Sequence, residues 1–217
     1  MDFHALKERQ RAERERYPPN LTLRVHRALS WLDRAEQLEG DPDGQFIFLW
    51  IAFNAAYATE IDERYRLSEQ GTFRAFLQKL VDLDAGRGRI EELVWREFSG
   101  SIRLLLDNPY VFQDFWSFHN GSMPEEDWKR RFADAKRAAH AALGNRDTVT
   151  VLSVVLSRIY TLRNQLMHGG ATWNSSVNRD QIRDCTSLMG KLVPLVIEIM
   201  MDHHEALWGD ACYPVVK

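Results

Sequence analysis

The chain has 217 residues, of which 45% are hydrophobic and 27% are charged, and this is enough apolar material for the core of one domain. Its 28 lysine and arginine residues nearly balance 31 aspartate and glutamate residues, so no global positive field draws it to nucleic acid or anionic lipid. We therefore expect a single helical domain over residues 1–217, in which any contact with nucleic acid is local.

The two cysteines, Cys185 and Cys212, lie far apart in the sequence. This spacing excludes a disulfide framework, a zinc knuckle and a redox motif. The first 20 residues are too charged for a signal peptide. No apolar run approaches the roughly 18 residues of a membrane span. We expect a soluble cytoplasmic protein without membrane contact, metal or cofactor.

Mixed charges in "LKERQRAERERY" fall at helical spacings and predict a solvated helix that ends at Pro18 and Pro19. Residues 1–19 are thus expected to form a charged N-terminal helix or arm. Asn20 or Thr22 can cap the next helix. The apolar residues of that helix fall near one face, and they are Leu21, Val25, Leu29, Leu32 and Leu38.

The segment "QFIFLWIAFNAAYA" is apolar on every side, which predicts a helix in the middle of a bundle. Asn54 is its polar interruption. A buried amide without a partner costs about 1–3 kcal/mol, so Asn54 should bond to backbone or to the polar face of the helix at 147–168. We expect it to support a site there.

Glycine and proline residues separate the remaining helical patterns. The predicted helices are 72–84, 88–107, 109–118, 125–143, 147–168 and 178–208. The run "TVTVLSVVLSRIYTL" is rich in β-branched residues that suit a strand, but its apolar positions recur at three and four, which predicts a helix. The expected fold class is therefore all-α, a helical bundle with additional helices between 84 and 146.

Two polar segments invite a functional interpretation. The helix at 125–143 carries a basic strip that suits either RNA binding or a solvated charged face, with Trp128 and Phe132 on its apolar side. The strip consists of Lys129, Arg130, Arg131, Lys136, Arg137 and Arg146. "DHHE" at 202–205 has metal-binding side chains, but adjacent histidines point about 100° apart on a helix, which favours surface residues or a helix cap.

The stretch "RIYTLRNQLMHGG", residues 158–170, has two faces when about 100° is added per residue. Leucines and Ile159 form a core stripe. The second face consists of Tyr160, Arg163, Asn164, Met167 and His168. Lysine and carboxylates are missing from it, so it suits an interface or cleft. Arginine can hold a phosphate, histidine can move protons near neutral pH, and an amide four residues before His168 can orient the imidazole.

An ordinary helix end remains an alternative. Gly169 allows a left-handed cap that leaves His168 in the last turn, where imidazolium favours the helix dipole, and Arg163 can pair with an acid at the core edge. Arg163 and His168 lie about 140° apart on an ideal helix. They can act on one phosphate only if the helix end distorts or a second subunit completes the cleft.

"RNQLMHGG" resembles the Arg-x(4 to 6)-His motif of the HEPN superfamily (higher eukaryotes and prokaryotes nucleotide-binding). The resemblance includes "RVHRALSWLDRAE" and "LWIAFNAAY" and covers roughly 21 to 208, with identity only in short pieces. The segments between 84 and 146 are long for a minimal member. The resemblance implies metal-independent RNA cleavage, in which Arg163 stabilises negative charge, His168 acts as general acid or base, and Asn164 supports both.

The resemblance also implies a homodimer in which two motifs share one cleft. This agrees with the second face derived from helix geometry, so Tyr160 and Met167 of that face, together with Asn54, are the expected cleft or supporting residues. RNA is the expected substrate, cut by attack of its 2′-hydroxyl on the adjacent phosphate. Proteins of this kind serve as toxins or anti-phage effectors, which implies an antitoxin or sensor protein as partner. The alternative is a non-catalytic HEPN-like module that binds a nucleotide or a protein, or a scaffold in which the motif only caps a helix.

Overall fold

A computed structural model describes residues 2–58, 69–176 and 178–213. These residues form α-helices with short 3-10 and π-helical turns, and they contain no β-strand. The prediction of an all-α fold class is therefore confirmed. No helix in the described part of the chain is long and apolar enough to cross a membrane.

The chain forms two compact units. Unit 1 comprises Met1–Ile90 and Ile182–Lys217, and unit 2 comprises Glu91–Gln181. Unit 2 is thus inserted into the sequence of unit 1. The single domain expected over residues 1–217 stays a prediction.

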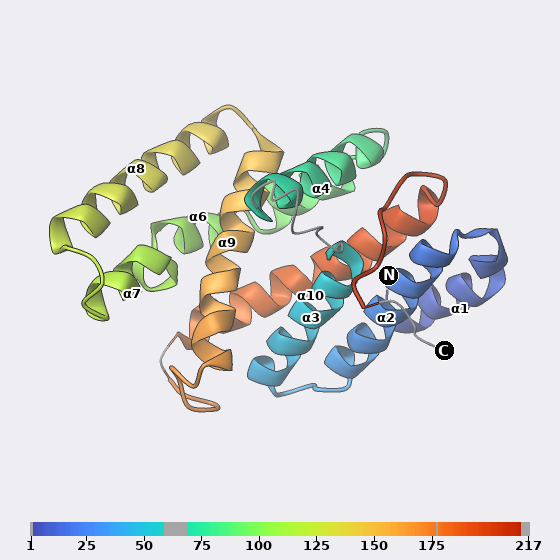
Figure 1. The fold of residues 1–217 in the computed structure, drawn as a ribbon, viewed down its shortest axis with the longest axis horizontal. Coiled ribbons are helices and arrows are strands. Elements are labelled where there is room, and N and C mark those ends of the chain that lie inside the picture. Colours follow the sequence, from blue (N-terminus) through green and yellow to red (C-terminus); the bar gives the residue numbers. More distant parts are fainter. Residues whose placement is uncertain (1, 59–68, 177, 214–217) are drawn as a thin grey trace. The chain divides into compact units, whose positions relative to one another are not determined.

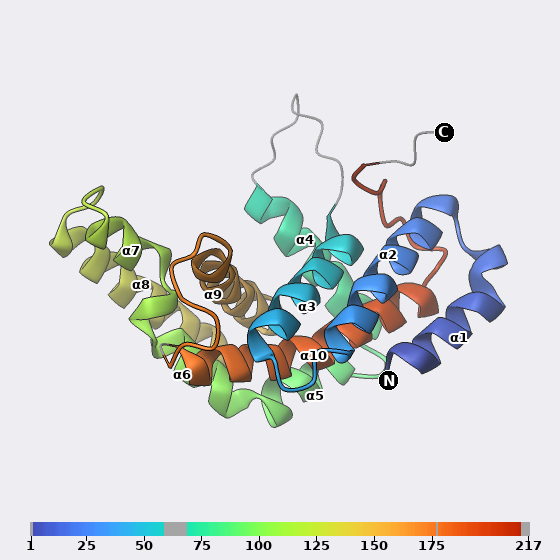
Figure 2. The same cartoon turned by 90° about the horizontal axis from the view of Figure 1, so that it is seen from below.

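Unit 1 is built around a helical hairpin. Its helices are α1 (Phe3–Glu13), α2 (Pro19–Glu36), α3 (Pro42–Tyr57), α4 (Glu69–Asp84) and most of α10 (Arg179–Asp202). The α2 and α3 helices lie side by side (Figures 1 and 2). The prediction of a helix in this segment is confirmed; seven of the 16 residues of α3 are buried, and the others are partly covered.

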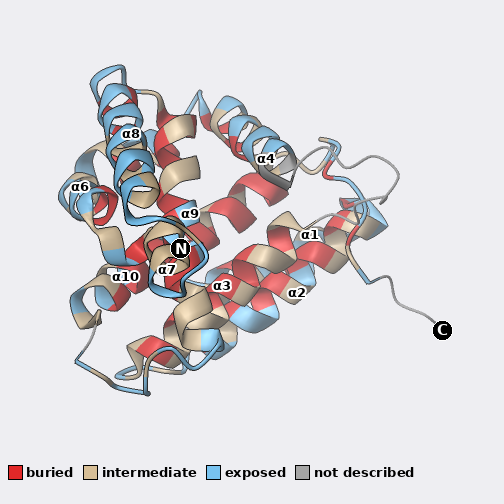
Figure 3. Ribbon diagram, turned by 60° about the vertical axis from the view of Figure 1, so that its left-hand side comes forward, coloured by how far each residue is buried: buried red, intermediate tan, exposed pale blue. Residues whose placement is uncertain are grey.

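The α10 helix packs closely on α3. The Thr186 hydroxyl donates to the Pro42 carbonyl at 3.3 Å. A Cβ at Gly190 would lie 3.9 Å from the Leu49 Cδ1 atom, which is ordinary contact distance. Buried residues follow α10, α3 and α2 in Figure 3, and they form the core of unit 1.

Two predicted helix boundaries in unit 1 are wrong. The α2 helix starts earlier than expected, with Pro18 as its N-cap and Pro19 in its first turn, where proline needs no amide hydrogen. Asn20 instead donates its side-chain amide to the Gly209 carbonyl at 2.9 Å. The α10 helix ends at Asp202 rather than 208, and the indole of Trp208 folds back to donate to the His203 carbonyl at 3.0 Å.

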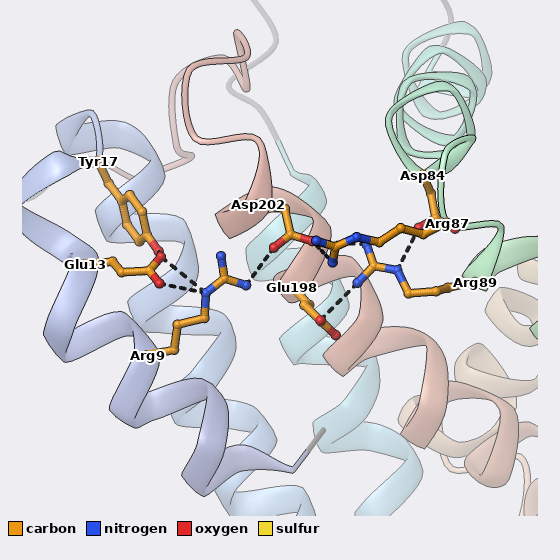
Figure 4. A network of polar contacts seen from close by, with 8 residues as sticks. All are labelled: Arg9, Glu13, Tyr17, Asp84, Arg87, Arg89, Glu198 and Asp202. Carbon is orange, nitrogen blue, oxygen red and sulfur yellow. Dashed lines mark hydrogen bonds and ion pairs between the residues drawn. The ribbon is translucent and has the colours of Figure 1, made fainter.

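A network of ionic contacts joins α1 to the end of α10 (Figure 4). Arg9 donates through Nη1 to Asp202 at 2.8 Å and through Nε to Glu13 at 3.0 Å. Tyr17 donates its hydroxyl to Glu13 at 2.6 Å. The charged N-terminal segment is therefore fixed to the helices of unit 1.

The other side of Asp202 receives two arginines from the segment after α4. Arg87 and Arg89 donate to its Oδ2 atom at 2.9 and 3.1 Å. Arg89 also donates to Asp84 at 2.8 Å and contacts Glu198 at 3.0 Å. Asp202, the first residue of the "DHHE" segment, is thus an ion-pair acceptor shared by three arginines.

Unit 2 is a second set of helices. It contains the end of α5 (Arg89–Glu92), a π-helical turn (Leu93–Glu97), α6 (Ser99–Asp107), a 3-10 turn η4 (Pro109–Val111), α7 (Gln113–His119), α8 (Glu125–Gly144) and α9 (Thr148–Met167). The β-branched run lies in α9, so its prediction as helix is confirmed.

Two helices predicted as continuous in unit 2 are interrupted. The segment 88–107 contains the π-helical turn and then Phe98, whose backbone leaves the helical region. The segment 109–118 divides at Phe112, where the extended backbone separates η4 from α7. The lengths of these helices therefore depend on local backbone geometry, which the spacing of apolar residues does not predict.

Candidate functional site

The α9 helix carries the predicted motif in its last two turns. Asp147 caps its start by accepting from the backbone and hydroxyl of Thr150 at 2.9 and 2.6 Å. Five residues of the predicted core stripe are buried, namely Leu152, Val155, Leu156, Ile159 and Leu162, whereas its last member, Leu166, is only partly covered. The direction of this stripe determines which side chains point away from the core.

The second face of α9 reaches the surface of unit 2. Tyr160 and Met167 are about half exposed, and His168 is exposed. Arg163 and Asn164 are half-buried. A surface that combines large apolar groups with arginine and histidine is typical of an interface or a ligand site.

Arg163 is held by its neighbour. Its Nη1 atom donates to the Asn164 side-chain oxygen at 2.9 Å. Arg163 makes no ion pair with a carboxylate in the described part of the chain, so the alternative of a core-edge acid finds no support. Asn164 therefore orients the guanidinium, whose other donors have no anionic partner among the described residues.

Gly169 and Gly170 end α9 in a Schellman cap. Gly169 has φ +70. It donates to the Leu166 carbonyl at 3.2 Å, and Gly170 donates to Gln165 at 2.7 Å. This confirms the left-handed cap at Gly169 and places His168 at the helix end.

The helix shows no distortion before His168. It remains α-helical through Met167, and His168 still donates its backbone amide to Asn164 at 3.0 Å. The separation of about 140° between Arg163 and His168 on an ideal helix therefore holds. A site that uses both side chains on one phosphate then requires a second copy of the chain.

Asn54 lies in α3 of unit 1, whereas the motif lies in unit 2. Asn54 is half-buried, and its backbone carbonyl accepts from Ala58 at 2.7 Å. Its supporting role in the site stays a prediction.

Arg158, the first residue of the quoted stretch, is a feature that the motif did not reveal. It is only 4% exposed, and its guanidinium lies 4.4 Å from the centre of the Phe112 ring and 5.8 Å from that of Phe132. Burial lowers the pKa of Arg158 to about 10, although the charge of Asp114 opposes this shift. The only sequence signal was an arginine within an apolar run.

The rings around Arg158 belong to a larger group, here named the aromatic cluster, which spans η4, α7 and α8. It consists of Tyr110, Phe112, Phe115, Trp116, Phe118, Trp128 and Phe132. No residue of α7 is fully buried. The Tyr110 carbonyl accepts from Trp116 at 2.7 Å and from Gln165 of α9 at 2.6 Å, so the cluster lies beside the motif helix.

The basic strip of α8 is largely neutralised by nearby acids. Its ion pairs are Lys129–Glu125, Arg130–Asp127, Arg131–Asp114, Lys136–Asp107 and Arg137–Asp134. The remaining member, Arg146, was predicted on the same helix but lies beyond the end of α8, and its guanidinium is 5.2 Å from the centre of the Trp95 ring. This arrangement favours the solvated charged face over an RNA-binding strip.

Comparisons with protein-family models, with curated proteins and with solved structures give no match. Any function of the chain must therefore be inferred from its own residues. Unit 2 offers an oriented arginine and an exposed histidine at the end of α9, and a buried arginine under aromatic rings.

Proposed function

We propose that the chain is a metal-independent endoribonuclease of the HEPN type, with Arg163, Asn164 and His168 as its catalytic motif. The observation that carries the proposal is the state of Arg163: Asn164 holds its guanidinium, and no carboxylate of the described chain neutralises it. A fixed, uncompensated guanidinium suits a phosphate oxygen. The exposed His168 supplies an imidazole, which can accept or donate a proton.

The reaction follows from these groups. The 2′-oxygen of RNA forms a bond to the adjacent phosphorus while the bond from phosphorus to the 5′-oxygen breaks, which leaves a cyclic phosphate and a 5′-hydroxyl. His168 accepts the proton of the 2′-hydroxyl or donates a proton to the leaving 5′-oxygen. Arg163 stabilises the negative charge that gathers on the phosphate oxygens in the transition state.

A homodimer completes the site in this proposal. Trp173, which is 71% exposed, follows the α9 cap, and Tyr160 and Met167 are exposed on α9 itself. Large apolar groups at the surface favour burial against a second copy. Two antiparallel motifs then place Arg163 of one copy near His168 of the other.

The biological role proposed with this chemistry is that of a toxin or anti-phage effector in the cytoplasm. Uncontrolled RNA cleavage harms the host cell, so an antitoxin or a sensor protein would restrain or trigger it. This role depends entirely on the cleavage activity.

Cleavage of single-stranded RNA in the presence of EDTA tests the proposal. His168→Ala and Arg163→Ala should each abolish cutting, whereas His140→Ala, which removes an exposed histidine of α8, should cut normally. Loss of wild-type cutting in EDTA contradicts the metal-independent mechanism. A folded wild-type protein that binds nucleotide or protein but never cuts RNA is instead the non-catalytic module.

Mixing the two inactive variants tests the composite site. When Arg163→Ala and His168→Ala chains exchange freely, about half of the dimers are mixed, and each mixed dimer holds one intact pair. Cleavage should then recover to roughly a quarter of the wild-type rate. No recovery, with mixed dimers shown by mass spectrometry, would place both groups in one chain and refute the shared cleft.

A further inference from the structure

Arg158 is a buried charge whose hydrogen-bonding capacity is not used. Its side chain is 4% exposed, and its Nε atom is fully covered and has no hydrogen-bond partner. The guanidinium makes no ion pair with a carboxylate in the described part of the chain. An unpaired buried cation is unfavourable, so this position suits an anion supplied from outside.

The surroundings restrict how an anion can approach. The Phe112 ring lies over the guanidinium at 4.4 Å, and its face is thereby covered. Guanidinium donors lie in the plane of the group, so a ligand oxygen must come in along that plane. Asp114, the carboxylate that acts on Arg158 at longer range, is already held by Arg131 at 3.4 Å.

A second donor without a partner lies in the same cluster. The Nε1 atom of Trp128 is buried and has no hydrogen-bond acceptor in the described residues. The Trp128 and Phe132 ring centres are 6.3 Å apart, and Phe132 also lies 5.8 Å from the Arg158 guanidinium. Indole and guanidinium groups donate only, so both select a ligand rich in acceptor oxygens, such as a phosphate.

The aromatic cluster adds a surface for flat, apolar groups. Tyr110 is 52% exposed, and no residue of α7 is fully buried. A cation beside accessible rings is the combination that binds single-stranded nucleic acid, with phosphates on the charge and bases stacked on the rings. Tyr110 accepts from Gln165, the residue after Asn164 of the motif, so a strand on the cluster would lie close to the motif.

We propose that Arg158 and the aromatic cluster form a binding site for single-stranded RNA, with a phosphate at Arg158 and a neighbouring base on the rings. The choice of RNA depends on the proposed function of α9, whereas the anion site depends only on the state of Arg158. The site is a binding site, separate from the groups that cleave.

Binding of a 2′-O-methyl single-stranded oligonucleotide tests this site without cleavage, because its blocked 2′-oxygen cannot attack. Fluorescence anisotropy of a labelled strand provides the readout. Arg158→Met should weaken binding by about tenfold or more and reduce the slope of log affinity against log salt by about one. Arg137→Met, a matched change on the exposed face of α8, should leave affinity unchanged.

Stability and cleavage measurements separate the possible outcomes. Arg158→Met should not lower the melting temperature, because an apolar side chain replaces an unpaired buried charge. Wild-type affinity in Arg158→Met overturns the site. Binding of inorganic phosphate without binding of the oligonucleotide overturns its assignment to RNA. Binding that depends on Arg158 in a protein that never cuts RNA supports this site and refutes the proposed nuclease.

Discussion

Replacing Asp202 by alanine should destabilise unit 1 by about 2–4 kcal/mol. The Asp202 side chain is only 12% exposed, and it accepts from Arg9 at 2.8 Å, Arg87 at 2.9 Å and Arg89 at 3.1 Å. A hydrogen bond to a charged group contributes about 1.5–3 kcal/mol, but the contact with Arg87 counts for little because Arg87 is 62% exposed.

The loss is limited because the two covered arginines keep other partners. Arg9 retains Glu13, and Arg89 retains Asp84 and Glu198, so neither guanidinium is left without a carboxylate. The free energy of unfolding can be measured by urea titration with far-ultraviolet circular dichroism. Arg87→Ala is the matched control and should cost less than about 1 kcal/mol. Equal losses in both variants, or a loss below about 1 kcal/mol in Asp202→Ala, would refute this account of the network.

The ion pairs of Asp202 also determine how the free energy of unfolding should depend on pH. Burial alone raises the pKa of Asp202, but the hydrogen bonds from Arg9 and Arg89 and the nearby arginine charges hold it below its ordinary value of 3.8. The unfolded chain therefore binds this proton first as the pH falls. The contribution of Asp202 to the free energy of unfolding is complete when the pH is above the ordinary pKa of 3.8, and it is lost in more acidic solution. In Asp202→Ala the stability should fall less steeply in this acidic range.

Two further predictions concern single positions in α9 and α10. Gly169→Ala should lower the free energy of unfolding by about 1–2 kcal/mol, because its backbone angle φ of +70 is strained for an L-residue, although an added Cβ meets nothing within 4 Å. Gly144→Ala is the control: an added Cβ there also meets nothing within 4 Å, but the residue is helical, so this change should not destabilise the protein. Burial raises the pKa of the Cys185 thiol to about 12, so iodoacetamide at pH 8 should modify Cys185 only after unfolding, and rapid modification of the native protein would contradict its packing.

Some elements of the fold could be predicted from the sequence because the information is local. The three-and-four spacing of Leu152, Val155, Leu156 and Ile159 outweighed the β-branched composition of α9, and all four residues are buried. The apolar residues on every side of α3, interrupted by Asn54, likewise predicted a covered helix. The apolar spacing did not predict where the helices end. The α2 helix begins at Pro19 with Pro18 as its N-cap, and beyond the end of α10 the Trp208 indole donates back to the His203 carbonyl.

The contacts that bring distant residues together could not be predicted in the same way. Asp202 appeared as part of a metal-like "DHHE" segment, yet its partners come from α1 and from the segment after α4. Arg158 appeared as the start of a polar helix end, yet Phe112 and Phe132 surround it. In both cases the charge of the residue was visible in the sequence, but its environment depended on packing between elements far apart along the chain.

Arg158 and Arg163 show why spacing alone does not assign a function within the motif. The two residues are five positions apart on α9, which separates them by about 7.5 Å along the helix axis and about 140° around it. Arg158 therefore meets aromatic rings, whereas Arg163 meets Asn164 at the surface. Two guanidiniums so placed on one rigid helix point in different directions and are unsuited to holding the same phosphate. Loss of cleavage in Arg163→Ala and loss of oligonucleotide binding in Arg158→Met should consequently be separable effects.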